Sequence, residues 1–254
     1  MPISPQPLFN TEFVSKFGVD PGREKPRINN IENTDARIDV YFRDLKTEII
    51  NRIEKYPVVA GCVAWLTDFD IIRAMRGKNV SIIMQKEDMF RPDIGGDSTG
   101  FKKRLRRAYS EVGAGFSYAL LPETSTLGSL WKGYGHHSGF YSDHDCRVDD
   151  DRFDPFRCVG NYNRDKSPAF ARMHNKFLVF CEEEMDCDYK PVEVWTGSYN
   201  MSKSASLSFE NGLSIRSTAI ASAYLHEYAD IAALSEPLDW KYEWVAPEFG
   251  IGVS

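Results

Sequence analysis

The spacing of hydrophobic positions changes several times between residues 37 and 66. Apolar residues alternate with polar ones over 38–42, which predicts a half-buried strand. Asp44 is then placed to cap a helix over 45–53, whose leucine and isoleucines fall on one face. Residues 58–66 form an almost continuous apolar run, which is typical of a strand buried on both faces. This part of the chain therefore predicts a strand, a helix and a second, deeper strand.

The same rhythm continues beyond this buried run. Thr67 and Asp68 offer caps for a short helix that reaches Met75, and Gly77 ends it. The apolar stretch 80–84 predicts another buried strand. Strands that alternate with helices in this way are typical of a parallel or mixed sheet covered by helices. We therefore expect an α/β fold: a mixed β-sheet flanked by helices.

The second half of the chain has clear elements on either side of an irregular region. We expect helices at 98–111 and 219–234, and strands at 116–121, 156–159, 176–181, 192–195 and 212–215. Three parts follow from this pattern: a proline-containing N-terminal arm over 1–34, a domain over 35–235, and a C-terminal tail over 236–254 that packs across the domain. An irregular insertion near 122–155, rich in Gly, His and Asp, lies inside the domain.

Composition and charge narrow the classes of function. The formal net charge is −6, so any binding to nucleic acid must come from a local basic patch. The five cysteines do not indicate a disulfide framework and fit a reducing cytoplasm. No apolar run approaches the roughly 18 to 20 residues that span a bilayer, and the polar start of the chain is unlike a signal peptide. We expect a cytoplasmic protein without membrane contact.

A basic run on the first long helix of the second half is the candidate patch. Its side chains could bind the phosphates of a nucleic acid, but they could equally form a solvated helix face. The candidate substrate-binding residues in this run are Lys102, Lys103, Arg106 and Arg107.

The strongest chemical signal is a histidine and a lysine two residues apart. His174 and Lys176 come just before the apolar stretch 177–180, which predicts a strand. Because side chains alternate along a strand, the imidazole and the ammonium point the same way. The positive charge would hold phosphate oxygens and keep the imidazole neutral, and hence nucleophilic, near physiological pH. This pair suits attack on a phosphodiester.

Further polar residues follow at the next predicted strand ends. Ser198 and Asn200 share a face if their strand continues that far, and their hydroxyl and amide could donate hydrogen bonds to phosphate oxygens. Glu210 opens the following strand, where a carboxylate could orient an imidazole. Alternatively, Ser198 and Asn200 could simply form a turn. The ends of neighbouring strands are a usual place for a site in α/β folds.

The stretch 173–215 resembles the histidine–lysine motif of the phospholipase D superfamily. The match lies in His174-x-Lys176 with its apolar strand, in Gly-Ser-x-Asn at 197–200, and in Glu-Asn at 210–211. It is most similar to the small nuclease-type members that carry one motif per chain. One departure is Cys181, which stands where the family motif usually has an aspartate.

The resemblance implies a mechanism that needs two chains. Family members build one site from two motifs, and this chain has one, because its other histidines are not followed two places later by lysine. The implied site lies at a homodimer interface and needs no metal or other cofactor. One His174 would form a phosphohistidine, and His174 of the partner subunit would protonate the leaving oxygen and then activate water. Lys176 and Asn200 would stabilise the equatorial oxygens, and Glu210 would orient a histidine.

The expected function is therefore a metal-independent nuclease that acts on DNA or RNA, with DNA favoured. A phospholipase is the alternative within enzymes, although no strongly amphipathic helix or lipidation motif is evident. A catalytically silent, dimeric nucleic-acid-binding protein is the other alternative, and the intact His174, Lys176, Asn200 and Glu210 speak against it. A zinc site is a separate hypothesis, which rests on residue types that bind zinc: His136, His137, His144, Cys146 and Cys158.

Overall fold

The computed structural model describes residues 35–91, 93, 100–113, 116–117, 152–162, 172–183 and 189–246. Its helices are α2 (Leu45–Lys55), α3 (Phe69–Ala74), α4 (Phe101–Ser110), the short 3-10 helix η4 (Ala205–Leu207) and α6 (Thr218–Ala233). Its strands are β1 (Arg37–Tyr41), β2 (Val58–Val63), β3 (Asn79–Gln85), β4 (Phe116–Ser117), β5 (Arg152–Phe153), β6 (Phe156–Val159), β7 (Lys176–Glu183), β8 (Tyr189–Gly197), β9 (Gly212–Arg216) and β10 (Glu236–Pro237).

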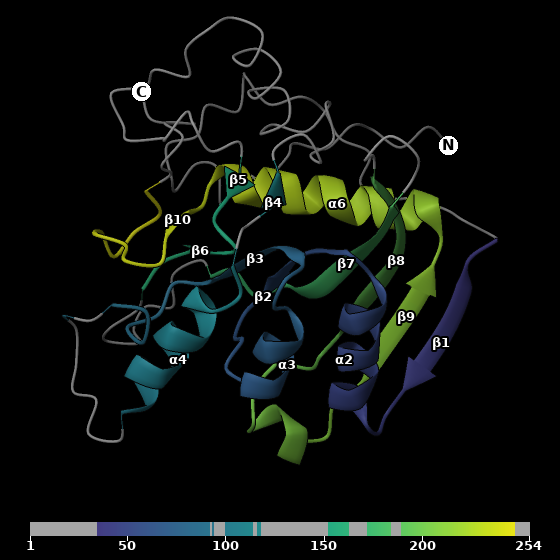
Figure 1. The fold of residues 1–254 in the computed structure, drawn as a ribbon, viewed down its shortest axis with the longest axis horizontal. Helices are drawn as coiled ribbons and strands as arrows, with labels where there is room; N and C mark the ends of the chain where they lie inside the picture. The colour runs from purple at the N-terminus through teal and green to yellow at the C-terminus, as the bar shows by residue number, and fades with distance from the viewer. Residues whose placement is uncertain are drawn as a thin grey trace, which may run out of the picture.

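A mixed sheet forms the centre of the described part of the chain. Its eight strands follow the order β1-β9-β8-β7-β2-β3-β6-β10. The pairs β2–β3 and β3–β6 are parallel, and the remaining neighbours are antiparallel. Helices α2, α3 and α4 lie on one side of this sheet and α6 lies across the other, as Figure 1 shows. The predicted fold class, a mixed sheet flanked by helices, is confirmed.

The central strands are buried on both faces, as their apolar runs predict. Val59 and Val63 of β2 pack into the cluster that includes the buried side chains of α2, α3 and α4. Val58 and Cys62 point the other way, into the cluster that includes Tyr228 of α6. Alternate residues of one strand thus serve two cores, which explains why β2 lacks the polar positions of a half-exposed strand. No helix within the described residues has the length and apolarity required to cross a bilayer.

The two predicted aspartate caps have different outcomes. Asp68 caps α3, since its Oδ1 accepts hydrogen bonds from the backbone N–H groups of Asp70 at 2.9 Å and Ile71 at 3.3 Å. Asp44 precedes α2 as predicted, but its side chain makes no cap hydrogen bond. Its backbone is left-handed, with φ of 56°, whereas a capping residue normally has an extended backbone. The prediction of a side-chain cap at Asp44 is therefore wrong.

Strand β1 is present, but the face that packs against the core is the opposite of the one that the sequence pattern predicts. Ile38 and Val40 are 55% and 56% exposed. Tyr41 instead faces α2, and its hydroxyl accepts a hydrogen bond from Arg52 of that helix. The ring centroid of Tyr41 lies 5.4 Å from that of Trp195 on β8. β1 is an edge strand that pairs with β9 alone, so alternation did not identify its buried face.

The segment expected as a tail contributes to the sheet. β10 starts at Glu236, pairs with β6 and is the outermost strand on that side of the sheet. Trp240 is buried, and the fully buried Lys86 donates hydrogen bonds to the carbonyl oxygens of Tyr242 at 2.8 Å and Trp244 at 2.6 Å. Residues 236–246 therefore pack against the sheet and the end of β3.

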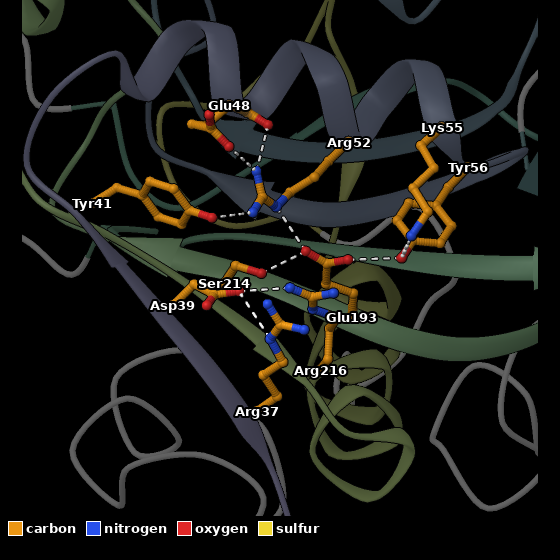
Figure 2. Close-up of polar contacts among 10 residues, drawn as sticks. All are labelled: Arg37, Asp39, Tyr41, Glu48, Arg52, Lys55, Tyr56, Glu193, Ser214 and Arg216. Carbon is orange, nitrogen blue, oxygen red and sulfur yellow. Dashed lines mark hydrogen bonds and ion pairs between the residues drawn. The ribbon is translucent and has the colours of Figure 1, made fainter.

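A buried polar network ties α2 to three strands (Figure 2). The Glu193 carboxylate accepts hydrogen bonds from Arg52 Nε at 2.7 Å, Tyr56 Oη at 2.7 Å and Ser214 Oγ at 2.5 Å. Burial by itself would raise the pKa of Glu193, but the Ser214, Tyr56 and Arg52 contacts outweigh it and hold this pKa below its usual range. Since Arg52 also binds Tyr41 of β1, one guanidinium links the edge strand to the helix and to β8.

We expect Glu193→Gln to lower the free energy of unfolding by about 3 kcal/mol, because breaking a buried ion pair leaves the Arg52 charge incompletely compensated. The difference in the free energy of unfolding between wild type and variant should have its full size above the unfolded-state pKa of glutamate. It should shrink as the pH falls toward the lowered folded-state pKa. Urea unfolding between acid and neutral pH measures both effects. Arg73→Ala, which removes an exposed pair with Asp70, is the control and should cost at most about 1 kcal/mol. Equal stability of the two variants would contradict the assigned role.

Candidate active site

The sheet topology brings the predicted site residues to one edge. β7 runs antiparallel to both β2 and β8, so its first residue, Lys176, lies opposite Val63 at the end of β2. Gly197 at the end of β8 is paired in turn with Gly212 at the start of β9. Residues just before β7, just after β8 and just before β9 therefore meet at this edge, as the sequence predicted for His174, Ser198 and Glu210.

His174 and Lys176 lie against each other. Lys176 Nζ is 3.3 Å from His174 Nδ1 and donates a hydrogen bond of 3.0 Å to the His174 carbonyl oxygen. His174 comes before the first residue of β7, but the carbonyl of Asn175 accepts a hydrogen bond of 3.0 Å from Ala64 and holds the segment against the end of β2. The predicted common orientation of the two side chains is therefore present.

Trp65 is a neighbour of His174 that the sequence did not indicate. It was expected inside the core strand, but β2 ends at Val63 and Trp65 is only half-buried. Its ring meets the imidazole edge-on, with ring centroids 6.3 Å apart and planes at 90°. Its indole Nε1 donates a 3.0 Å hydrogen bond to Glu87. Nothing in the local sequence pattern signals this contact, because the residues involved lie far apart in the chain.

The surroundings of His174 favour its neutral form. Partial burial lowers the pKa of His174, and the positive charges of Lys176 and Arg172 lower it further. Partial burial also lowers the pKa of Lys176, against the opposing effect of the Glu210 carboxylate. A neutral imidazole beside a cation is the combination that nucleophilic attack on a phosphodiester requires.

Ser198, Glu210 and Asn211 form a compact polar cluster. The Ser198 hydroxyl donates a short hydrogen bond to the Glu210 carboxylate and accepts one of 3.0 Å from the Asn211 backbone. β8 ends at Gly197, so the strand does not continue to Ser198 and Asn200 as the shared-face prediction required. Asn200 is half-buried, and its Oδ1 atom is buried with no hydrogen-bond partner in the described part of the chain. Within one chain, Glu210 thus orients a serine hydroxyl.

Gly197 explains how this cluster can be so compact. A Cβ atom at this position would lie 2.3 Å from the carbonyl oxygen of Asn211, and the backbone φ of 156° is one that side chains disfavour. The glycine of the Gly-Ser-x-Asn motif therefore lets the chain before β9 approach the end of β8.

Cys181, at the position of the family aspartate, takes no part in the polar site. Its side chain is buried in the cluster on the α6 side of the sheet. Burial raises the pKa of its thiol to about 12. Its contribution is to the packing of β7.

The basic run lies on α4, and its members are differently placed. Lys102 pairs with Asp88 at 3.0 Å and Arg106 donates to the Met89 carbonyl at 3.1 Å, so one side of α4 contacts the chain that follows β3. Arg107 is the next residue, and it pairs with Glu111 at 2.8 Å. Lys103 is exposed. Lys102 and Arg106 therefore contact the chain that leaves the edge of the sheet that carries His174.

The zinc hypothesis falls mostly on residues that the structure does not describe: His136, His137, His144 and Cys146. Cys158 is described; it is buried in β6, where its thiol donates a 3.3 Å hydrogen bond to the Pro237 carbonyl and its pKa is raised by burial. Among the described residues, no group of three or more potential metal ligands is present.

We expect Lys176→Gln to raise the pKa of His174, because it removes a cation that disfavours the imidazolium. The pKa should stay below that of a free histidine, since burial is the larger cause and remains. An NMR titration of the imidazole protons measures the change. Lys78→Gln, at the opposite edge of the sheet beside the first residue of β3, should leave the titration unchanged. A His174 pKa that does not respond to Lys176→Gln would contradict the assigned coupling.

No protein-family model matches the chain. Uncharacterized protein L381 of Acanthamoeba polyphaga mimivirus is 29% identical to it over 214 residues, which are 83% of this chain and 70% of that protein. Among solved structures, NucT from Helicobacter pylori is similar with a TM-score of 0.41 and 14% identity, covering 78% of this chain and 98% of NucT. Nuc from Salmonella typhimurium, a phospholipase D family member, is similar with a TM-score of 0.43 and 15% identity, covering 80% of this chain and 97% of Nuc.

Proposed function

We propose that the protein is a phosphodiesterase of the phospholipase D type, which hydrolyses nucleic acid without a metal ion and prefers DNA as its substrate. The observation that carries this proposal is the contact between Lys176 and His174, 3.3 Å from ammonium nitrogen to imidazole nitrogen, at a partly exposed sheet edge. The cation can bind a phosphate oxygen while it keeps the neighbouring imidazole neutral. The motif resemblance of 173–215 supports the same chemistry.

In the proposed reaction, the neutral ring nitrogen of one His174 attacks phosphorus and the bond to the leaving oxygen breaks. His174 of the partner subunit, which is the protonated member of the pair in this step, donates its proton to that oxygen. It then removes one proton from the water that hydrolyses the phosphohistidine and so returns to its protonated form. Lys176 and the amide of Asn200 stabilise the equatorial oxygens, and the start of α4, with Lys102 and Lys103, attracts the phosphates of the flanking chain.

The proposed dimer follows from the number of imidazoles that the reaction needs. His226, the other histidine of the described residues, lies on α6, which covers one face of the sheet, and not at the edge that carries His174. Leu207 and Phe209 are 84% and 100% exposed, and they lie between Asn200 and Glu210 in the chain. A second copy that brings its own His174 to this edge would cover both apolar side chains. We call Leu207 and Phe209 the rim pair.

We expect His174→Ala to abolish phosphodiester hydrolysis and to leave the fold and the dimer intact, because it removes the nucleophile. His226→Ala is the matched control and should retain activity. The assay compares single-stranded DNA, duplex DNA, RNA and phospholipid vesicles, in the presence of excess chelator. Turnover by the purified His174→Ala protein would refute the assignment, cleavage of vesicles alone would indicate a phospholipase, and a loss in chelator that metal restores would exclude the metal-independent mechanism.

We expect the double substitution Leu207→Ser, Phe209→Ser to weaken the dimer by roughly 10,000-fold or more, since each buried apolar side chain contributes about 1.5–3 kcal/mol and the contact occurs twice. Hydrolysis should fall with the dimer fraction. Analytical ultracentrifugation over a concentration series measures the first effect. The control is the double substitution Ile38→Ser, Val40→Ser on the exposed face of β1, which should leave the dimer unchanged. If the rim-pair variant stays dimeric and its KM rises, this surface binds nucleic acid instead of a second copy.

A further inference from the structure

The three residues Gln85-Lys86-Glu87 lie at the end of β3 and reach the surroundings of His174 from two sides. Gln85 is the last residue of β3, and Lys86 and Glu87 follow it. β3 is parallel to β2, so its end lies at the same edge as Val63 and the start of β7.

The first contact fixes the backbone before the histidine. Gln85 is buried, and its Oε1 accepts a 2.8 Å hydrogen bond from the backbone N–H of Met173, the residue before His174. Its amide nitrogen donates to the carbonyl oxygens of Asn161 at 2.8 Å and Lys86 at 3.0 Å. All polar atoms of this amide group are thus engaged, so its position is well determined and the chain that enters the site is held in place.

The second contact fixes the ring. Glu87 accepts a 3.0 Å hydrogen bond from the indole Nε1 of Trp65, and the Trp65 ring stands perpendicular to the His174 imidazole. An indole that is held at its nitrogen cannot rotate freely, so its edge limits the orientations open to the imidazole. Lys176 reaches the same imidazole with its ammonium nitrogen.

Residues 236–246 bind the segment Gln85-Lys86-Glu87 through hydrogen bonds and an ion pair. Lys86 is fully buried and ion-paired with Glu236, and it donates hydrogen bonds to the carbonyl oxygens of Tyr242 and Trp244. The indole of Trp240 donates a 3.2 Å hydrogen bond to the carbonyl oxygen of Glu87. Since Glu87 is bound through both its backbone and its side chain, it is a rigid support rather than a flexible surface carboxylate.

We propose that Glu87 is a positioning residue, which acts through Trp65 to set the orientation of the His174 imidazole for attack on phosphorus. This inference rests on the proposed function, because it assigns a role in the reaction of that same site. Attack requires the nitrogen lone pair to lie in line with the bond that breaks, and small errors in such alignment are costly in rate. Among the described residues, Glu87 reaches the imidazole through Trp65, so we expect its effect to fall on turnover and not on substrate binding.

The experiment compares Glu87→Met, Glu87→Gln and Trp65→Phe. Glu87→Met removes the hydrogen-bond acceptor and keeps the chain length; Trp65→Phe removes the N–H donor and keeps an aromatic ring. Both should lower kcat about 10-fold to 100-fold, as expected for a misaligned nucleophile, with KM unchanged. Glu87→Gln keeps an acceptor oxygen and should restore kcat to within a few-fold of wild type. The matched control is Glu54→Met on the exposed surface of α2, and it should retain full activity.

A readout that does not depend on activity separates this inference from the proposed function. An aromatic ring shifts the NMR resonances of nuclei near it, and Trp65 lies beside the His174 imidazole, so we expect these resonances to move in Glu87→Met and Trp65→Phe but not in the Glu54→Met control. Unchanged resonances and unchanged kcat in both variants would overturn the inference, and so would a Glu87→Gln protein as impaired as Glu87→Met. If Glu87→Met does not fold, Trp65→Phe decides alone. If the wild-type protein hydrolyses no nucleic acid but the resonances move, the proposed function fails while the positioning contact stands.

Discussion

The antiparallel pairing of β7 with β2 is the constraint on which the rest of the candidate site depends. The two strands approach so closely at Gly61 that a Cβ atom there would lie 2.2 Å from the carbonyl oxygen of Phe177. Because β2 and β3 are parallel and β7 runs against them, the start of β7 meets the ends of both. The pairing thus joins His174 and Lys176, which precede and begin β7, to residues that follow β2 and β3. Without this reversal of direction, the same polar residues would lie at opposite edges of the sheet.

The middle of the sheet and the edge that carries His174 use charge in different ways. In the middle of β8, Glu193 is buried with Arg52, and their charges neutralise each other within a shared hydrogen-bond network. At the edge that carries His174, Lys176 contacts an imidazole whose neutral form offers no opposing charge. A buried, compensated pair is costly to break, whereas a cation beside a neutral imidazole remains available for an anion. The first arrangement is suited to holding β1, β8 and α2 together, and the second to binding and attacking a phosphate.

Sequence pattern identified the central elements well because burial on both faces leaves little freedom. The apolar runs of β2 and β3 and the helical spacing of α6 fit a sheet that is covered on both faces, and their side chains fill the two cores. The pattern failed at β1, where Ile38 and Val40 are exposed and Tyr41, on the other face of the strand, packs against the core. There, Tyr41 is held by Arg52 and by the ring of Trp195, residues that are distant in sequence, and these contacts outweigh the local alternation.

The chemical core of the candidate site can be recognised from local sequence alone: a histidine and a lysine two residues apart before an apolar strand, and then Ser198, Asn200 and Glu210 next to the later strands. These residues are close in sequence or lie beside predicted strands, so a local pattern can reveal them. The surroundings of these residues depend on the fold. Trp65 and Gln85 follow or end β2 and β3 and reach His174 and Met173, and Glu87 reaches Trp65, because the sheet places those strand ends together. Such contacts depend on strand order and register, which no short stretch of sequence encodes.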